Sequence, residues 1–143
     1  KFTKKIINNE KIEVFNYGDM MRDFTYIDDV VESMIRLINN PPNINQNFDK
    51  SNPLPNTSWS PFNIFNEGNS TPIQLMKYVE AIELALNKKA TIDFLPMQPG
   101  DVEMTFANSN LLYEWINYRP STPVNKGIKN FVEWYINYFK KTN

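Results

Sequence analysis

The stretch Lys11–Asp29, KIEVFNYGDMMRDFTYIDD, decides how the rest of the chain is read. Its first part, which includes Val14 and Phe15, has the β-branched and aromatic residues of a short strand. A polar loop with one arginine follows, and the run FTYI after it predicts a second packed strand. Asp28 then has the placement of a helix N-cap, and Asp29 adds a favourable charge to the first turn.

The arginine of this loop, Arg22, suits two different roles. A guanidinium held where a loop meets a strand can donate paired hydrogen bonds to a phosphate or a carboxylate. Asp19, Asp23 and Asp28 also lie nearby in the sequence, and surface ion pairs of this kind are common and contribute little stability. The residues alone leave both roles open, with the local ion pair as the more common one.

A second loop, PMQPGDVEMT at positions 96–105, interrupts the regular patterns of the second half. Two prolines and a glycine restrict its turn, so that Gln98 and Asp101 are presented from a stiff backbone. Such an arrangement is useful for hydrogen-bonding a polar ligand. A solvated turn without a ligand is the alternative, and the residues alone favour it.

The composition excludes several classes of function. The 143 residues suffice for one domain, which at this length buries roughly two thirds of its unfolded surface. Cysteine and histidine are both absent, so the sequence predicts no disulfide and no thiolate or imidazole metal site. A net charge of −1 without a basic stripe predicts no nucleic-acid partner. No apolar run reaches the roughly 18–20 residues of a membrane helix.

We expect a small α/β domain over residues 1–143, with short strands paired as two little sheets and three or four helices. Residues 41–60 are rich in proline and asparagine and predict an irregular loop, with Trp59 as its apolar anchor. The opening residues look like the back half of a helix, so we expect a fragment of a longer protein. The remaining predicted elements are a buried helix to about residue 40, a strand at 62–66, a core-facing helix at 72–87, a strand at 90–95, a short helix to 115 and a final helix at 123–140.

The run RDFTYIDDV at 22–30, preceded by EVFNYG, resembles the C-terminal substrate-binding part of extended short-chain dehydrogenases/reductases that act on nucleotide sugars. It looks most like the UDP-glucuronate 4-epimerases. The resemblance continues in order through the blocks at 62–83, 95–108 and 118–135, and therefore covers nearly the whole chain.

The resemblance implies a role for each candidate residue. Arg22 is implied to contact the diphosphate of a UDP-sugar, and Asp101 to hydrogen-bond the ribose. The strand that carries Val14 and Phe15 is implied to border the uracil. Gln98 belongs to the same set of substrate-binding positions, although galactose-type epimerases tend to carry an arginine in this loop.

The resemblance also implies NAD, bound by an N-terminal Rossmann domain of the same parent chain. That domain carries a glycine-rich loop and a Tyr-x-x-x-Lys motif, and this sequence has neither, so we expect a fragment without catalytic residues that is inactive alone. The implied parent is a cytoplasmic, NAD-dependent UDP-sugar 4-epimerase. A dehydratase or decarboxylase of the same family and a non-catalytic binding module are the alternatives. Helix faces left uncovered in the fragment predict self-association.

Overall fold

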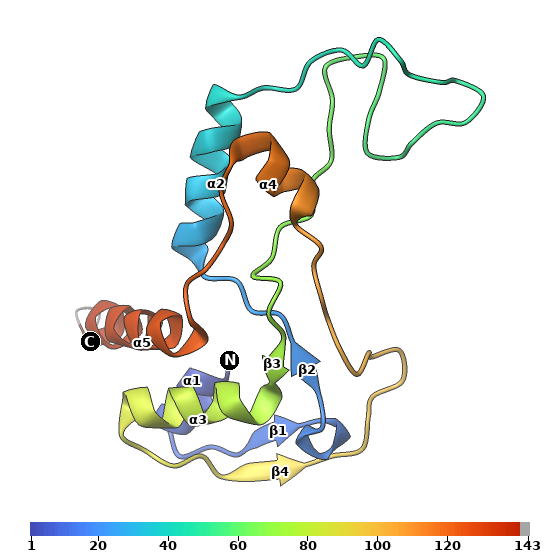
Figure 1. Ribbon diagram of the computed structural model, residues 1–143. Coiled ribbons are helices and arrows are strands. Elements are labelled where there is room, and N and C mark those ends of the chain that lie inside the picture. The colour runs from blue at the N-terminus through green and yellow to red at the C-terminus, as the bar shows by residue number, and fades with distance from the viewer. Residues whose placement is uncertain (141–143) are drawn as a thin grey trace. The chain divides into compact units, whose positions relative to one another are not determined.

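The computed structural model describes residues 1–140, which contain five α-helices and four short β-strands (Figure 1). The chain forms two compact units. Unit 1 consists of Lys1–Phe24, Thr71–Phe106 and the chain from Thr122 onward. Unit 2 consists of Thr25–Ser70 and Ala107–Ser121. No helix within residues 1–140 is long and apolar enough to cross a membrane.

Unit 1 contains all four strands, paired as two small sheets. Strand β1 (Ile12–Val14) runs parallel to β4 (Ile92–Phe94), and β2 (Met21–Arg22) runs antiparallel to β3 (Ile73–Gln74). This arrangement confirms the predicted α/β class with two little sheets. The number of helices is five rather than three or four, because two short segments, Phe2–Ile7 and Asn110–Ile116, also form helices.

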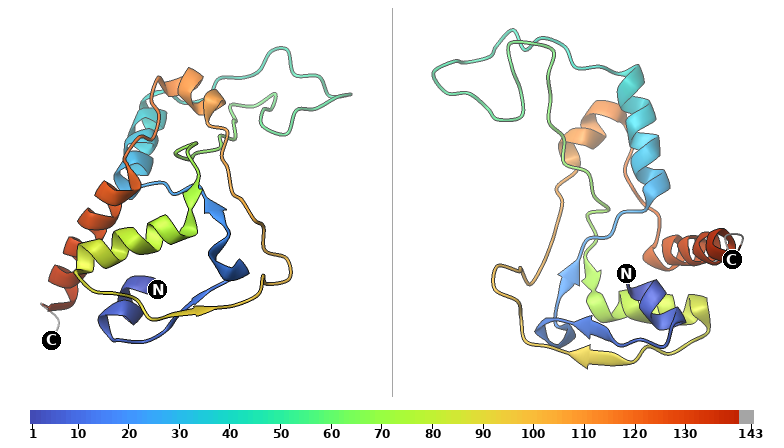
Figure 2. Two further views of the ribbon diagram at one scale, coloured as in Figure 1. Left: turned by 60° about the horizontal axis from the view of Figure 1, so that its bottom comes forward. Right: turned by 180° about the vertical axis from the view of Figure 1, so that it is seen from behind.

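Three helices pack around the parallel sheet of unit 1. They are α1 (Phe2–Ile7), α3 (Leu75–Leu86) and α5 (Val124–Lys140), and α3 lies against α5, as Figure 2 shows. Because the buried side chains come from β1 and from all three helices, segments from both ends of the chain share one core. Its buried members are Ile6, Ile12, Val14, Val79, Ala81, Ile82, Ile128 and Val132.

Helix α3 differs from the sequence prediction at its start and on its face. It begins at Leu75 rather than Pro72, because Ile73 and Gln74 pair with β2 as a strand. The apolar repeat of this helix predicts that Ile82 and Leu84 both face the core, but Ile82 is 1% exposed whereas Leu84 is 79% exposed. The two residues point in different directions because positions two apart on a helix lie on different faces.

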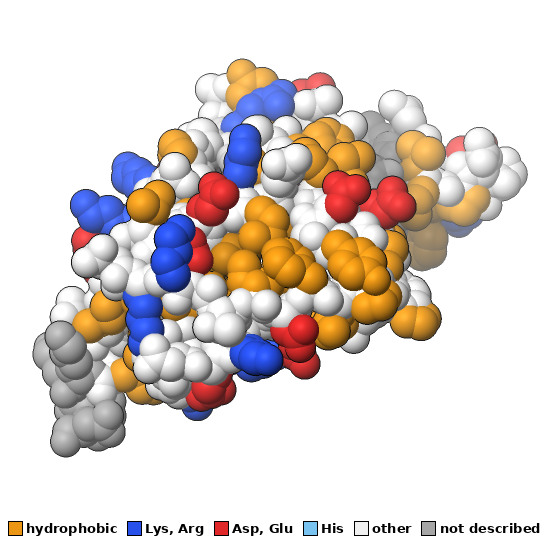
Figure 3. Space-filling view, turned by 90° about the horizontal axis from the view of Figure 1, so that it is seen from below, with side chains coloured by type: hydrophobic (Ala, Val, Ile, Leu, Met, Phe, Trp, Pro, Cys, Tyr) orange, Lys and Arg blue, Asp and Glu red, His pale blue; other side chains and the backbone are white. Residues whose placement is uncertain are grey.

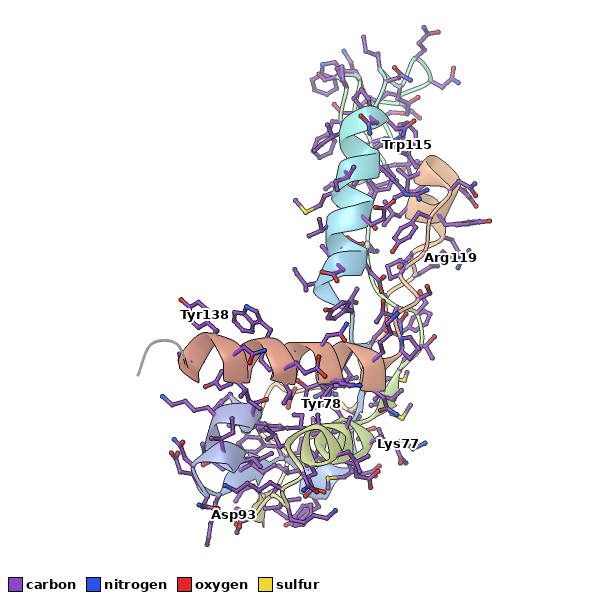
Figure 4. All side chains as sticks on the ribbon, turned by 90° about the vertical axis from the view of Figure 1, so that its left-hand side faces the viewer. Lys77, Tyr78, Asp93, Trp115, Arg119 and Tyr138 are labelled. Carbon is purple, nitrogen blue, oxygen red and sulfur yellow. The ribbon has the colours of Figure 1, made fainter. Side chains whose placement is uncertain are left out.

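Unit 1 also exposes apolar side chains. Figure 3, a view from below, shows hydrophobic side chains gathered over the middle of that face, with charged side chains around them. On α5, Tyr138 lies on the side that faces away from α3 (Figure 4). Its ring stacks on Trp134 with centroids 5.4 Å apart. Phe131 and Phe139 of the same helix are also exposed, at 36% and 46%.

Unit 2 is built on α2 (Ile27–Asn39) and α4 (Asn110–Ile116). The buried carboxylate of Asp29 joins distant segments: it accepts hydrogen bonds from the Tyr118 hydroxyl at 3.0 Å and from the Ser121 N–H at 3.2 Å. Burial raises the pKa of Tyr118 to about 12, and the hydrogen bond to Asp29 adds to the rise. The phenol therefore stays protonated and keeps this hydrogen bond at neutral pH.

Two predictions about the start of α2 are wrong. The run FTYI is not a strand: β2 ends at Arg22, and Phe24 instead stacks on Tyr78 with ring centroids 4.1 Å apart. Strand pairing stops there because β3 is only two residues long. The residue at the N-cap position is Tyr26 rather than Asp28, and Asp28 lies inside the first turn, where its charge still suits the helix dipole.

The apolar face of α2 was predicted to be buried, and it is exposed. The residues of α2 that are buried are Asp29 and Ser33, on the polar side of the helix. The prediction failed because periodicity identifies an apolar face but not what covers it. We refer to this face as the α2 stripe; its exposed members are Ile27, Val31, Met34, Ile35 and Ile38.

No helix or strand lies between the end of α2 and the start of β3. An isolated bridge joins Thr57 and Asn63, and the exposed Trp59 meets Phe48 edge-on with centroids 5.5 Å apart. The strand predicted at 62–66 is absent, because no other strand of residues 1–140 lies beside it to complete a ladder. At the end of α2, the Trp115 indole (labelled in Figure 4) donates to the Asn40 carbonyl at 2.8 Å.

Candidate functional site

Strand β2 and the loop 95–106 lie side by side in unit 1. The Met21 N–H donates to the Glu103 carbonyl at 2.8 Å, and the Thr105 N–H donates to the Met21 carbonyl at 3.1 Å. The Thr105 hydroxyl also accepts a hydrogen bond from the Asp23 N–H at 3.0 Å. These bonds fix the returning half of the loop on both sides of Arg22.

Arg22 is held in place by backbone carbonyls and by one carboxylate. Its Nη1 donates to the carbonyls of Met21 at 2.8 Å and of Glu103 at 3.1 Å. Its Nη2 lies 3.2 Å from Oδ1 of Asp101, and the two side chains are 19% and 35% exposed, respectively. The guanidinium is thus oriented by its surroundings, as a binding group must be, and remains partly open to solvent.

The structure brings Arg22 and Asp101 together although they are 79 positions apart. An ion pair for Arg22 was one of the two roles left open by the sequence, but the partner considered there was an aspartate close in sequence. Such a long-range pair is invisible to local sequence reasoning. The sequence offered the two residues as separate candidates, and the resemblance assigned them to different parts of one ligand.

Asp101 is itself fixed by its turn. Its N–H donates to the Gln98 carbonyl at 3.1 Å, and its Oδ1 accepts the Val102 N–H at 3.0 Å. Gly100 has a φ of +84°, a left-handed conformation that favours glycine. The side chain of Gln98 is exposed, so this residue contributes its carbonyl to the turn and presents its amide to solvent.

The strand β1 offers less apolar surface than expected. Val14 is 0% exposed and belongs to the core of unit 1, which corrects the expectation that the side chains of both Val14 and Phe15 border the uracil. Val14 is buried because β1 lies between the helices and β4. Phe15 is half-buried, and its carbonyl accepts the Gly18 N–H at 3.0 Å. A side-chain contact from this strand to a base would therefore come from Phe15.

The residues after Phe15 form a strained turn that sequence reasoning missed. Asn16, Tyr17 and Gly18 have φ values of 48°, 51° and 87°, three left-handed residues in succession. Strain of this kind collects at ligand-binding loops. The Tyr17 N–H donates to the Leu95 carbonyl at 3.0 Å, which ties the turn to the loop that carries Asp101. The available signal was an aromatic residue placed before glycine in a polar loop.

The described residues do not fit a dinucleotide or a metal ion. A dinucleotide fold needs a strand, a glycine-rich turn and then a helix, whereas β1 leads through a short 3₁₀ turn (Asn16–Gly18) into β2. Within residues 1–140, no group of three or more acidic side chains lies close enough to hold a metal ion. What the site offers chemically is a fixed cation, a nearby acceptor and a half-buried aromatic ring.

Comparisons with known proteins identify similar sequences. A profile of the NAD dependent epimerase/dehydratase family matches residues 1–51. The protein CapI of Staphylococcus aureus is 45% identical over 141 residues, which cover 99% of this chain and 42% of that protein. A probable UDP-glucuronate 4-epimerase of Rhizobium meliloti is 39% identical, over 100% of this chain and 42% of its own length.

Solved structures share the fold. The UDP-glucuronic acid 4-epimerase from Bacillus cereus, in complex with UDP-glucuronic acid and NAD, superposes with a TM-score of 0.70 at 20% identity. The superposition covers 96% of this chain and 38% of that enzyme. The chain therefore belongs to the NAD dependent epimerase/dehydratase family. It spans 42% of the length of each of the two curated relatives named above.

Proposed function

We propose that this chain is the UDP-sugar-binding part of an NAD-dependent nucleotide-sugar 4-epimerase that acts on UDP-glucuronate. The observation that carries the proposal is the pairing of Arg22 with Asp101 on two adjoining segments of unit 1. A relative named as a probable UDP-glucuronate 4-epimerase matches the whole of this 143-residue chain, which supports the choice of sugar.

In this proposal each group recognises one part of the ligand. The Arg22 guanidinium, held by two carbonyls, donates to the diphosphate. Asp101 accepts hydrogen bonds from the ribose hydroxyls, and Phe15 and the backbone of β1 border the uracil. Gln98 presents its amide from the same turn as Asp101. Because these contacts all involve the UDP moiety, the hexose stays free to turn over between the two halves of an epimerisation.

The chemistry belongs to another part of the proposed parent. That part is an N-terminal Rossmann domain, which binds NAD and carries the catalytic residues. The described residues of this chain do not form the strand, glycine-rich turn and helix that bind a dinucleotide. The fragment alone is accordingly inactive in this proposal. The proposed parent protein is located in the cytoplasm, as the family resemblance implies.

The full-length protein tests the function directly. With NAD bound, it is expected to convert UDP-glucuronate into its C4 epimer, UDP-galacturonate, which chromatography separates from the substrate. Loss of carbon dioxide or water from the sugar would instead identify a decarboxylase or a dehydratase, the alternatives within the family. Binding of UDP-sugar without turnover would indicate a non-catalytic module.

The exposed α2 stripe supports the proposal that unit 2 contacts the Rossmann domain of the parent chain. Five exposed apolar residues on one helix face form a larger apolar surface than a finished protein usually leaves to water. We propose that the remainder of the parent chain covers this face. When that remainder is absent, as in the 143-residue chain alone, the stripe has no such cover, and self-association through it is the expected consequence.

The isolated 143-residue chain is therefore expected to dimerise or aggregate as its concentration rises, as measured by sedimentation velocity. The double variant Met34→Glu/Ile38→Glu places two like charges on the stripe and is expected to keep the chain monomeric. Leu84→Glu is the matched control, because it replaces another exposed apolar residue outside the stripe. Equal suppression by the control would show that general charge, and not the stripe, governs association.

A further inference from the structure

The donors of Arg22 are divided between neutral and charged partners. Its Nη1 donates to two backbone carbonyls, which are part of the scaffold and carry no net charge. Its Nη2 faces the Asp101 carboxylate at 3.2 Å and the Met20 sulfur at 3.5 Å. Asp101 is thus the anion already placed on the part of the guanidinium that a phosphate would approach.

Asp101 is also prevented from moving far from this position. Its Oδ1 is shared between Arg22 and the Val102 N–H, and its backbone N–H is tied to Gln98. A second anion at Arg22 therefore meets a fixed negative charge within a few ångströms, at a partly exposed position where solvent reduces the repulsion without removing it. Only a ligand that also donates hydrogen bonds to the carboxylate offsets that repulsion.

We infer that Asp101 is a specificity-determining residue that selects nucleoside diphosphates against bare phosphate anions. This inference rests on the proposed UDP-sugar site. Pyrophosphate carries the charge that Arg22 attracts but lacks the ribose hydroxyls that would donate to Asp101, so the carboxylate acts against it. UDP carries the same diphosphate and adds the two ribose hydroxyls, which turn the carboxylate into a partner. Discrimination by a repulsive element of this kind is a general route to specificity.

The test compares UDP with magnesium-free inorganic pyrophosphate as ligands of the full-length protein, with Asp101→Asn as the variant. Asparagine keeps the shape of the side chain and removes its charge. Pyrophosphate affinity is expected to rise by about three- to tenfold and UDP affinity to fall by about three- to tenfold, the range of a partly exposed charged contact. Isothermal titration calorimetry, or displacement of UDP where binding is weak, measures both constants.

Glu103→Gln is the matched control, since Glu103 lies in the same loop and contacts Arg22 through its carbonyl. It removes one charge near the site without changing that contact, so it is expected to leave the preference for UDP over pyrophosphate within about twofold of the unmodified protein, as for an exposed charge. An equal shift in the control would assign the effect to the general field of the loop and overturn the inference.

Three other results overturn the inference as well. If Asp101→Asn weakens both ligands, the carboxylate only orients Arg22; if it strengthens both, the ribose does not use the carboxylate; if neither constant changes, Asp101 is not at the site. The double variant Arg22→Ala/Asp101→Asn is expected to show no gain for pyrophosphate over Arg22→Ala alone. A UDP affinity that survives Arg22→Ala unchanged removes the proposed site itself, which distinguishes the two failures.

Discussion

Replacing Arg22 by alanine in the full-length protein is expected to weaken UDP binding by about ten- to a hundredfold, which corresponds to about 1.5–3 kcal/mol. The variant removes a charge-assisted contact to the diphosphate and also leaves Asp101 without its cationic partner. Isothermal titration calorimetry with UDP measures the loss. NAD retention is expected to change little, because the proposed cofactor site lies in another part of the parent.

Two further variants sharpen this expectation. Arg22→Lys keeps the charge but not the planar guanidinium that reaches two carbonyls and a carboxylate together. Its affinity for UDP is therefore expected to fall between that of the unmodified protein and that of Arg22→Ala. Arg119→Ala is the control: Arg119 stacks 4.3 Å from the centre of the Tyr113 ring in unit 2, outside the proposed site. If Arg22→Ala binds UDP as tightly as the control does, Arg22 has no part in recognition.

The largest effect on stability is expected at Ile82. Shortening this fully buried side chain to alanine leaves a cavity between α3 and its neighbours and is expected to lower the free energy of unfolding by about 2–5 kcal/mol. Leu84→Ala on the same helix is expected to change it by less than about 0.5 kcal/mol, because Leu84 is largely exposed. Urea unfolding of the 143-residue chain, followed by circular dichroism, measures both.

This pair of variants distinguishes the observed orientation of α3 from the one that periodicity suggested. Both residues were predicted to face the core, and both lose the same number of side-chain carbons. Losses of similar size would mean that Leu84 is buried in solution, by a different helix rotation or by an association between chains. Repeating the measurement at several protein concentrations separates those two causes.

The sequence was most informative where a pattern is long and self-contained. The opening helical turn, the first strand and the final helix were all predicted within a few residues, because each carries its own apolar repeat. The run FTYI misled because its aromatic residues do pack, but on Tyr78 of a helix rather than within a sheet. Propensity reports that a residue suits a packed surface and does not identify the partner.

The candidate site shows the same limit. Arg22 and Asp101 were both named in advance, from the loops that carry them and from the family resemblance, but their direct ion pair was not predicted. Val14 was placed at a surface because it lies on the right strand, yet the alternation along β1 sends its side chain into the core. Thr105 gave no signal at all, since its hydroxyl acts on the backbone of a residue 82 positions away.

The irregular segment at 41–60 has a practical consequence for protein engineering. Asn40, just before this segment, accepts a hydrogen bond from Trp115, and Asp29 accepts hydrogen bonds from Tyr118 and Ser121. These contacts within unit 2 do not involve residues 41–60. Lengthening an already open segment costs little chain entropy, about 0.6 kcal/mol for each doubling. An affinity tag or fluorescent reporter spliced in near Pro53 would thus burden the scaffold less than one placed anywhere along α3.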